Sequence, residues 1–516
     1  MSRIKMTAKN IAAGYTASII SMLLGFVSRT IFIYTLGSIY LGVNGLFTNV
    51  LGMLSLTELG IGTAMNFSLY KPVAKGDTKK IQGLMNFYKN AYRVIALVVA
   101  VLGLSLVPFL KYIIKGGEEL GYNQIQIYYL IFLFNTVITY FVSYKFSLVN
   151  AHQKNYIVTN VNIVTNFITV ASQIVILLLF KNFLLYLLIA SFIGLTQKIF
   201  ISFYLNRLFP YLKGKNKEKV PSEEFKAIKT NVASLIFHKL GDVCVSQTDN
   251  IIISSFLNVV IVGYLSNYNL IITSVTTFIM IFMNSVSASF GNMMVTENKE
   301  KVYDTYKTFR FTAFLLYGFS GLMFYFLLTP FITLWIGADK TLSSITIALI
   351  ILNHYLTGMR YSLIVVKTAA GVFKQDRFIL LLQAIINLVA SIILVKLIGL
   401  PGVFAGTVLQ SVVANIARPF IYYPIVFKKQ GIEYFKDSLL FLLTLASITI
   451  LGFVLKHFLL TEITWPLFIL FTAIFCLLTV GILYIFSRKR KEFIFLRQLV
   501  FGNIKKSFKK FKSTGG

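Results

Sequence analysis

The stretch from Asn231 to Leu257 reads NVASLIFHKLGDVCVSQTDNIIISSFL. It is long and apolar enough for a membrane-spanning helix, which needs about 20 residues. On a helix, His238, Asp242, Ser246 and Asp249 follow at i, i+4, i+8 and i+11 and share one face. Ionisable groups inside a membrane are costly and face a cavity or the interior of a helix bundle. The stretch therefore predicts a spanning helix with a polar face, which serves either a functional cavity or a structural seam between helices.

The composition around this stretch is typical of a polytopic helical membrane protein. Of 516 residues, 57% are hydrophobic and 13% are charged, against about 25% charged residues in soluble domains. The net charge of +31 is explained by the positive-inside rule and an anionic inner leaflet, so we expect no nucleic-acid partner. Cys244 and Cys476 lie in apolar segments and predict neither a disulfide nor a metal site.

Fourteen segments meet the length of about 17–25 apolar residues that a spanning helix requires. They are residues 11–36, 41–69, 91–114, 125–150, 158–180, 184–205, 231–257, 259–283, 311–336, 344–366, 378–398, 403–427, 439–459 and 465–486. With the N-terminus in the cytoplasm, most of the 49 Lys and Arg residues fall in cytoplasmic segments, and few fall in outer loops, among them Lys111, Lys115 and Lys181. This asymmetry predicts that both termini are cytoplasmic.

The order of spans and charged segments predicts the domain organisation. We expect a six-helix lobe at 1–206, a basic cytoplasmic linker at 207–230, a second lobe at 231–430, two further helices at 431–487 and a basic tail at 488–516. The tail lies on the inner membrane surface or is simply solvated. A weak internal match at an offset of about 220 residues places Tyr40-Leu41-Gly42 on Val262-Gly263, which favours a parallel repeat of two lobes.

Three cations inside the spans are candidates for a substrate cavity. Arg29, in Gly25-Phe26-Val27-Ser28-Arg29-Thr30, has a planar fork of donors that suits phosphate, or it pairs with an acid such as Glu58 or Asp249. Lys239 and Arg360 lie at other depths, and Asn353 and Thr357 share a helix face with Arg360. Arg29, Lys239, Arg360, Asn353 and Thr357 are therefore the predicted substrate-binding residues. Arg418 is near the inner end of its span, where we expect it to snorkel.

Four further residues are candidates for ion coupling or gating. They are Glu58, Asp242, Asp249 and His238. A carboxylate within a span is a proton site, a sodium site or the partner of an arginine. For other polar residues in the spans, such as Gln173, Gln383, Asn387 and Gln410, hydrogen bonding between helices is the favoured interpretation.

Several signals of enzymes are missing from the sequence. It has no phosphate-cradling Gly-rich loop with Lys, no zinc-ligand spacing and no nucleophile elbow. The short outer loops leave no room for the catalytic segment of a polysaccharide polymerase or ligase. We therefore predict a transporter without cofactors that uses an ion or substrate gradient.

Five strings, in this order, carry a resemblance to a known family. They are Gly25–Arg29 followed by Leu36-Gly37, then Tyr40–Leu46, Glu58–Gly62, Leu69–Pro72 and Thr248–Ile253. The chain resembles over essentially its whole length the Wzx-type polysaccharide flippases of the MOP (multidrug/oligosaccharidyl-lipid/polysaccharide) superfamily. The resemblance implies an all-α fold of about 14 transmembrane helices. Two six-helix lobes then form a V that alternates access, with two additional C-terminal helices.

The resemblance also implies a function. Such proteins move an undecaprenyl-diphosphate-linked oligosaccharide across the bacterial cytoplasmic membrane for surface polysaccharide biosynthesis. H⁺ or Na⁺ is an implied coupling ion, and polysaccharide polymerases or ligases are implied partners. Arg29 matches an arginine that meets the diphosphate in the related lipid II flippases, but other early cationic residues of those flippases have no match here, which speaks against lipid II as substrate. The alternative is a cation-coupled multidrug or toxin extruder of the MATE type, whose cavity would favour carboxylates.

Overall fold

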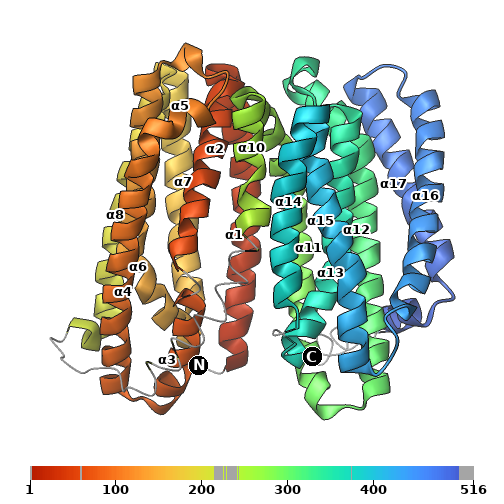
Figure 1. The fold of residues 1–516 in the computed structure, drawn as a ribbon, viewed down its shortest axis with the longest axis horizontal. Coiled ribbons are helices and arrows are strands. Elements are labelled where there is room, and N and C mark those ends of the chain that lie inside the picture. Colours follow the sequence, from red (N-terminus) through yellow and green to blue (C-terminus); the bar gives the residue numbers. More distant parts are fainter. Residues whose placement is uncertain are drawn as a thin grey trace, which may run out of the picture. The chain divides into compact units, whose positions relative to one another are not determined.

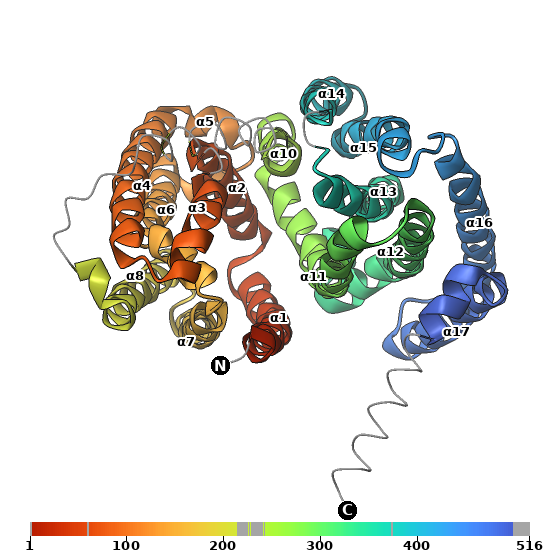
Figure 2. The same ribbon diagram turned by 90° about the horizontal axis from the view of Figure 1, so that it is seen from below.

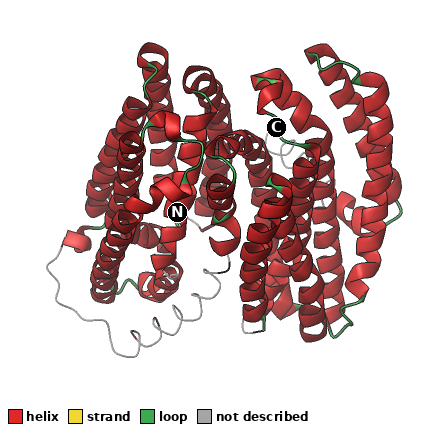
Figure 3. Cartoon of the chain, turned by 45° about the horizontal axis from the view of Figure 1, so that its top comes forward, coloured by secondary structure: helices red, strands yellow, loops and turns green. Residues whose placement is uncertain are grey.

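A computed structural model describes residues 3–58, 61–213, 225, 228, 241, 243–372 and 375–498. All the regular elements in these ranges are helices, as the secondary-structure colouring shows (Figure 3). A helix satisfies its backbone hydrogen bonds internally, which is what lipid demands of a spanning segment. Twelve helices within the described ranges are long and apolar enough to cross a membrane, which makes this a multi-pass membrane protein.

The chain divides into two compact units. Unit 1 comprises Met1–Ser274 and Ala384–Val403, and unit 2 comprises Val275–Gln383 and Phe404–Gly516. The helices wholly in unit 1 are α1 (Arg3–Leu36), α2 (Ser38–Leu54), α3 (Ile61–Lys75), α4 (Thr78–Leu106), α5 (Leu110–Ile113), α6 (Tyr122–Ala151), α7 (Asn155–Phe180), α8 (Phe183–Leu208) and α10 (Asp249–Phe256) (Figure 1). Unit 2 contains α12 (Lys299–Ile336), α13 (Ser344–Ala370), α16 (Glu433–Leu459) and α17 (Trp465–Ser487). Three helices, α11 (Val259–Thr296), α14 (Arg377–Ile398) and α15 (Leu400–Tyr422), contribute residues to both units.

The twelve long apolar helices coincide with twelve of the fourteen spans predicted from the sequence. The predicted span at 41–69 is wrong as a single helix, because α2 ends at Leu54 and a 3₁₀ turn, η1 (Ser55–Glu58), follows before α3. The carboxylate of Glu58 and the glycines after it weaken a continuous helix here. The predicted span at 231–257 lies largely outside the described residues, and α10 forms its last part.

Short connections fix the positions of the helices in unit 1. Gly37 turns the chain from α1 into α2 with φ at +85°, a conformation that favours glycine. Asp77 accepts a hydrogen bond from the Lys80 amide and begins α4, and Asn182 accepts one from the Leu185 amide and begins α8. These caps satisfy amide groups that a helix start otherwise leaves unpaired.

Glycines bring α2 directly against α11 in unit 1. A Cβ atom at Gly42 would overlap the carbonyl oxygen of Val259, and one at Gly263 would overlap the carbonyl oxygen of Ser38. Gly42 and Gly263 are the residues that the weak internal repeat places at equivalent positions. Seen from below, α2, α10 and the start of α11 lie side by side (Figure 2). Such backbone contact is possible only because neither glycine carries a side chain.

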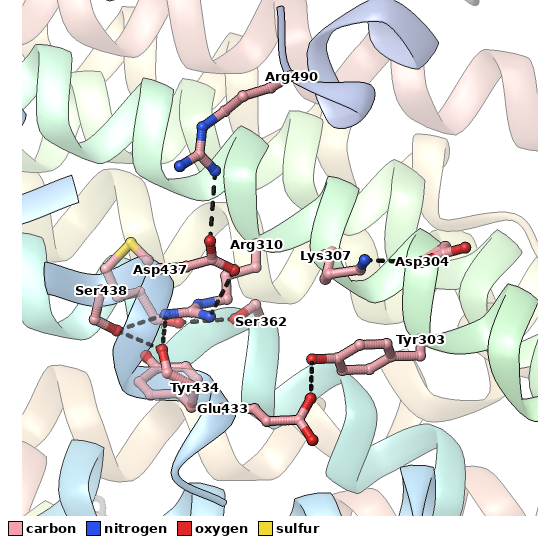
Figure 4. Close-up of polar contacts among 11 residues, drawn as sticks. Tyr303, Asp304, Lys307, Arg310, Ser362, Glu433, Tyr434, Asp437, Ser438 and Arg490 are labelled. Atoms are coloured by element: carbon pink, nitrogen blue, oxygen red, sulfur yellow. Dashed lines mark hydrogen bonds and ion pairs between the residues drawn. The ribbon is translucent and has the colours of Figure 1, made fainter. Parts of the chain in front are cut away.

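A buried arginine joins α12 to α16 in unit 2. Arg310 is 2% exposed and donates hydrogen bonds to the Tyr434 carbonyl at 2.6 Å and to Ser438 Oγ at 2.5 Å (Figure 4). Its guanidinium carbon lies 3.7 Å from the centre of the Tyr434 ring. Asp437 is near both Arg310, at 3.8 Å, and Arg490 after α17, at 3.5 Å (Figure 4). The cation is thus stabilised mainly by an aromatic face and neutral acceptors.

A second buried ion cluster corrects the interpretation of Arg418. This residue is 3% exposed and donates from Nε to Asp376 Oδ1 at 3.0 Å, so it does not snorkel. Lys367 donates to the other carboxylate oxygen at 2.5 Å. Burial acts to raise the pKa of Asp376, but the two cations and their hydrogen bonds outweigh it and hold that pKa below its ordinary value. The cluster fixes the connection before α14 against α13 and α15.

Candidate functional site

A cavity of about 180 Å³ in unit 1 surrounds Arg29. We call it the Arg29 pocket. It is lined by Ser21, Gly25, Ser28, Arg29 and Phe32 of α1, Leu41 and Asn44 of α2, Asn166, Val170 and Gln173 of α7, Tyr186 of α8 and Leu270 of α11. The lining combines one cation with hydroxyl and amide side chains, and none of these residues is a carboxylate. Its chemistry therefore suits an anionic, hydroxyl-rich group.

Arg29 makes a single side-chain hydrogen bond within the described part of the chain. Its Nη1 donates to Ser266 Oγ of α11 at 2.8 Å. The Ser266 hydroxyl in turn donates to the Gly263 carbonyl at 2.7 Å, which leaves its lone pairs for Arg29. Because a guanidinium has five N–H donors, most of its capacity is left for a ligand. Its partner here is neutral Ser266, not the sequence candidates Glu58 or Asp249.

Two amides of α7 add to the polar wall. Asn166 and Gln173 are seven residues apart and therefore lie on the same face of the helix. Asn166 donates to Ser21 Oγ at 3.3 Å, and Gln173 donates to the Tyr186 carbonyl at 3.3 Å. These bonds tie α7 to α1 and α8, as the sequence interpretation of Gln173 anticipated. The same amides retain acceptor and donor capacity toward the cavity.

The sequence predicted four further substrate-binding residues, Lys239, Arg360, Asn353 and Thr357. Lys239 falls outside the described residues. Arg360 is 9% exposed in unit 2, where it donates to Thr357 Oγ1 at 3.4 Å and to Ser411 Oγ at 3.5 Å. Ser411 donates to Asn353 Oδ1 at 2.6 Å. The expected face of Asn353, Thr357 and Arg360 is therefore one hydrogen-bonded group, while a common cavity with Arg29 stays a prediction.

The candidates for ion coupling are only partly described. His238 and Asp242 lie outside the described residues. Glu58 is half-buried in η1 and interacts electrostatically with Tyr92 and Tyr140. Asp249 is the first residue of α10, where a negative charge favours the helix start. Their coupling role stays a prediction.

Neighbours of Asp249 form a seam of amides with α2. Asn250 Nδ2 donates to Asn49 Oδ1 at 2.7 Å, and Asn49 Nδ2 donates to Gln247 Oε1 at 2.8 Å. Gln247 Nε2 reaches Ser246 Oγ at 3.2 Å. For this part of the 231–257 stretch, the polar residues serve the structural seam that was one of the two interpretations of the sequence.

Ser266, Tyr186 and Asn44 were not singled out from the sequence. Ser266 follows the repeat residue Gly263 by less than one helical turn, which is a weak signal at best. Its bond to Arg29 joins residues 237 positions apart. Only the folded arrangement of α1 and α11 reveals it.

The helical arrangement is similar to the fold of solved MATE and MurJ structures. A structure titled lipid II flippase MurJ, inward closed conformation, matches with a TM-score of 0.64 and 16% identity over 91% of this chain and 98% of that chain. A mutant of the Vibrio cholerae MATE transporter VcmN matches with a TM-score of 0.55 and 15% identity over 83% and 99%. An inward-facing multidrug resistance MATE transporter of the MOP superfamily matches with a TM-score of 0.55 and 14% identity over 79% and 96%.

At such identities the likeness establishes the fold. No family model and no curated protein matches the chain. The three structures named above are transporters or flippases, not enzymes. The fold is similar to that of these structures, one of which is titled a transporter of the MOP superfamily.

Proposed function

We propose that this protein is a flippase for an undecaprenyl-diphosphate-linked oligosaccharide in the bacterial cytoplasmic membrane. It would move the lipid-linked glycan from the inner to the outer leaflet by alternating access, for surface polysaccharide biosynthesis. The observation that carries the proposal is Arg29, whose guanidinium lies in a polar pocket with one neutral hydrogen-bond partner in the described chain. A cation so placed is available to an anionic substrate.

The physical problem of flipping fits such a pocket. A diphosphate with its sugars must cross a hydrocarbon core about 30 Å thick. Exposed to acyl chains, its charges and hydroxyls would lose their hydrogen bonds with water. The Arg29 pocket offers a forked cation for the phosphate and the side chains of Asn166, Gln173 and Ser28 for hydroxyls. The apolar lipid tail can remain in the bilayer.

Other parts of the proposal rest on the sequence. The distribution of Lys and Arg predicts that both termini lie in the cytoplasm. Glu58 and Asp249, with Asp242 and His238, remain candidates for coupling to H⁺ or Na⁺. Collapsing each gradient in turn tests this role, and indifference to both would mean that substrate alone drives transport. Polysaccharide polymerases or ligases are the expected partners in the pathway.

An extruder of cationic drugs is the second candidate, because two of the matched structures are MATE transporters. The lining of the Arg29 pocket disfavours it, since that lining contains a cation and no carboxylate. A cationic drug would be repelled by Arg29 and would find no opposite charge there. The pocket therefore favours an anionic cargo.

Deletion of the gene tests the proposal in cells. We expect one undecaprenyl-diphosphate-linked glycan to accumulate on the inner leaflet, and wild-type protein to restore its export. Arg29→Ala should not restore export although it reaches the membrane in equal amount, whereas Lys111→Ala, at a different cavity of unit 1, should. If no lipid-linked glycan accumulates and sensitivity to cationic drugs rises instead, the flippase proposal is wrong.

A further inference from the structure

A second polar cavity lies in unit 1, apart from the Arg29 pocket. Its volume is about 240 Å³. It is lined by Tyr40 of α2, Gln124, Ile127 and Tyr128 of α6, and Lys181, Asn182, Phe183 and Leu184 at the junction of α7 and α8. We call it the Lys181 pocket. It shares no lining residue with the Arg29 pocket.

The tight junction of α7 and α8 places the polar groups of this pocket. Lys181 ends α7 in the left-handed conformation, with φ at +47°, and its amide donates to the Leu177 carbonyl. Asn182 then caps α8 through Oδ1 and leaves its amide nitrogen available. On α6, Gln124 and Tyr128 are one turn apart, and the Tyr128 hydroxyl donates to Gln124 Oε1 at 3.4 Å. A cation and two amide side chains thus converge on one cavity.

One aromatic ring packs against residues of both pockets. Phe183 is 2% exposed. Its ring centre lies 4.9 Å from Tyr40 and 4.9 Å from Tyr128, which line the Lys181 pocket. It also lies 5.9 Å from Phe32 and 5.9 Å from Tyr186, which line the Arg29 pocket. Phe183 therefore connects the aromatic lining of the Lys181 pocket to that of the Arg29 pocket.

The lining of the Lys181 pocket selects a class of ligand. Amide and phenol groups pair with hydroxyls, aromatic side chains pack against the C–H face of a sugar ring, and Lys181 supplies one positive charge. No lining residue carries a negative charge. The volume is below the roughly 300–1,000 Å³ of pockets for drug-sized ligands, which suits a single sugar residue.

We propose that the Lys181 pocket binds one acidic sugar residue of the transported glycan. This proposal rests on the proposed function, because a lipid-linked glycan is what would bring a sugar to unit 1. It adds a second binding site for the same substrate. Arg29 holds the diphosphate, and the Lys181 pocket holds a sugar. The same hydroxyl-rich monoanionic chemistry occurs in glycerophosphate headgroups of lipids, so the test must separate the two sources.

Ligand-observed NMR on the purified full chain in detergent provides the test, with D-glucuronate, D-glucose and glycerol 3-phosphate as probes. Wild-type protein should bind glucuronate more tightly than glucose. Lys181→Asn removes the charge with a residue that tolerates a left-handed backbone, and it should weaken glucuronate binding at least tenfold. The matched change Lys111→Asn, in a cavity that also contains Glu118, should leave binding unchanged.

Other outcomes would overturn the proposal. They are absence of glucuronate binding by wild-type protein, equal binding by the Lys181→Asn variant, and Lys181-dependent binding of glycerol 3-phosphate without glucuronate. Arg29→Ala separates this proposal from the proposed function, because it should abolish flipping while glucuronate still binds. Gln124→Leu offers a second variant if Lys181→Asn does not fold, and it should weaken both sugars.

Discussion

Arg29 of α1 and Ser266 of α11 are joined by a 2.8 Å hydrogen bond, although 237 positions separate them in the chain. The donor is the charged guanidinium of Arg29, and the acceptor is the neutral hydroxyl of Ser266. Next to it, Gly263 packs against the backbone of α2. The cation of the Arg29 pocket is thus held at the place where α11 meets the first two helices.

Ser266→Ala should preserve substrate binding while it weakens the contact between α1 and α11. A hydrogen bond to a charged group contributes about 1.5–3 kcal/mol, so the variant should unfold at lower temperature. Arg29 keeps its charge, and we expect affinity for a diphosphate lipid to stay within threefold of wild type. Binding assays in detergent measure this. A loss as large as that of Arg29→Ala would mean that Ser266 itself contacts the substrate.

Gly42→Ala should separate α2 from α11. The new Cβ would overlap the Val259 carbonyl, and backbone cannot yield as a flexible side chain can. Overpacking of this kind costs about 1–3 kcal/mol, which thermal unfolding measures. Gly14→Ala is the matched control, since nothing lies within 4 Å of a Cβ there and alanine favours a helix. Equal stability of the two variants would contradict the close approach.

Asp376→Asn should destabilise unit 2, because it leaves Lys367 and Arg418 buried without their counter-ion. Breaking a buried ion pair from one side costs about 3–5 kcal/mol. The carboxylate of Asp376 also makes the stability of the wild-type protein depend on pH. Since the folded pKa of Asp376 lies below the unfolded value of about 3.9, its contribution is present above that value and is lost as pH falls through the folded pKa.

Unfolding temperatures in detergent from pH 6 to pH 3 measure this dependence, which Asp376→Asn should reduce. Asp339 is the control: its hydrogen bond with Lys340 also lowers its pKa, but the Asp339 side chain is exposed, so the pair should contribute little. If Asp339→Asn removes as much of the acid dependence as Asp376→Asn, the buried cluster is not its source.

Arg310→Lys should destabilise the contact of α12 with α16 by about 1–3 kcal/mol. In Arg310, Nη2 donates to both the Tyr434 carbonyl and Ser438 while Nη1 faces Asp437 (Figure 4). A lysine keeps the charge but has one nitrogen and lacks this planar fork. Lys307, one turn earlier on α12, is the control, because its partner Asp304 is largely exposed. Lys307→Ala should change stability by less than about 1 kcal/mol. Unfolding experiments on both variants under the same conditions measure the two losses of stability.

The sequence predicted the fold well because long apolar segments and the distribution of cations are local signals. Twelve predicted spans coincide with helices of the described chain. The 41–69 span was misread because apolar residues continue on both sides of Glu58, and hydropathy alone does not register a turn. Arg29 was singled out because a cation inside a spanning helix is costly, and its role in substrate binding stays a prediction.

Residues whose meaning depends on distant partners were harder to interpret. Arg418 looks like a snorkelling residue until the fold places Asp376, 42 positions away, against it. Arg310 lies just before a predicted span, and its sequence context does not indicate that it is buried. Its partner Tyr434 is 124 positions away. Gln247 and Asn250 lie within the 231–257 stretch but were not part of its predicted polar face, and only the position of Asn49 assigns them to the contact with α2.

The most direct test of the account is flipping of an undecaprenyl-diphosphate-linked oligosaccharide by purified protein in liposomes. Wild-type protein should expose the glycan to the opposite leaflet, Arg29→Lys should be intermediate because it keeps the charge without the fork, and Arg29→Ala should be inactive although it inserts normally. Flipping by Arg29→Ala at the wild-type rate would contradict the claim that this arginine holds the diphosphate.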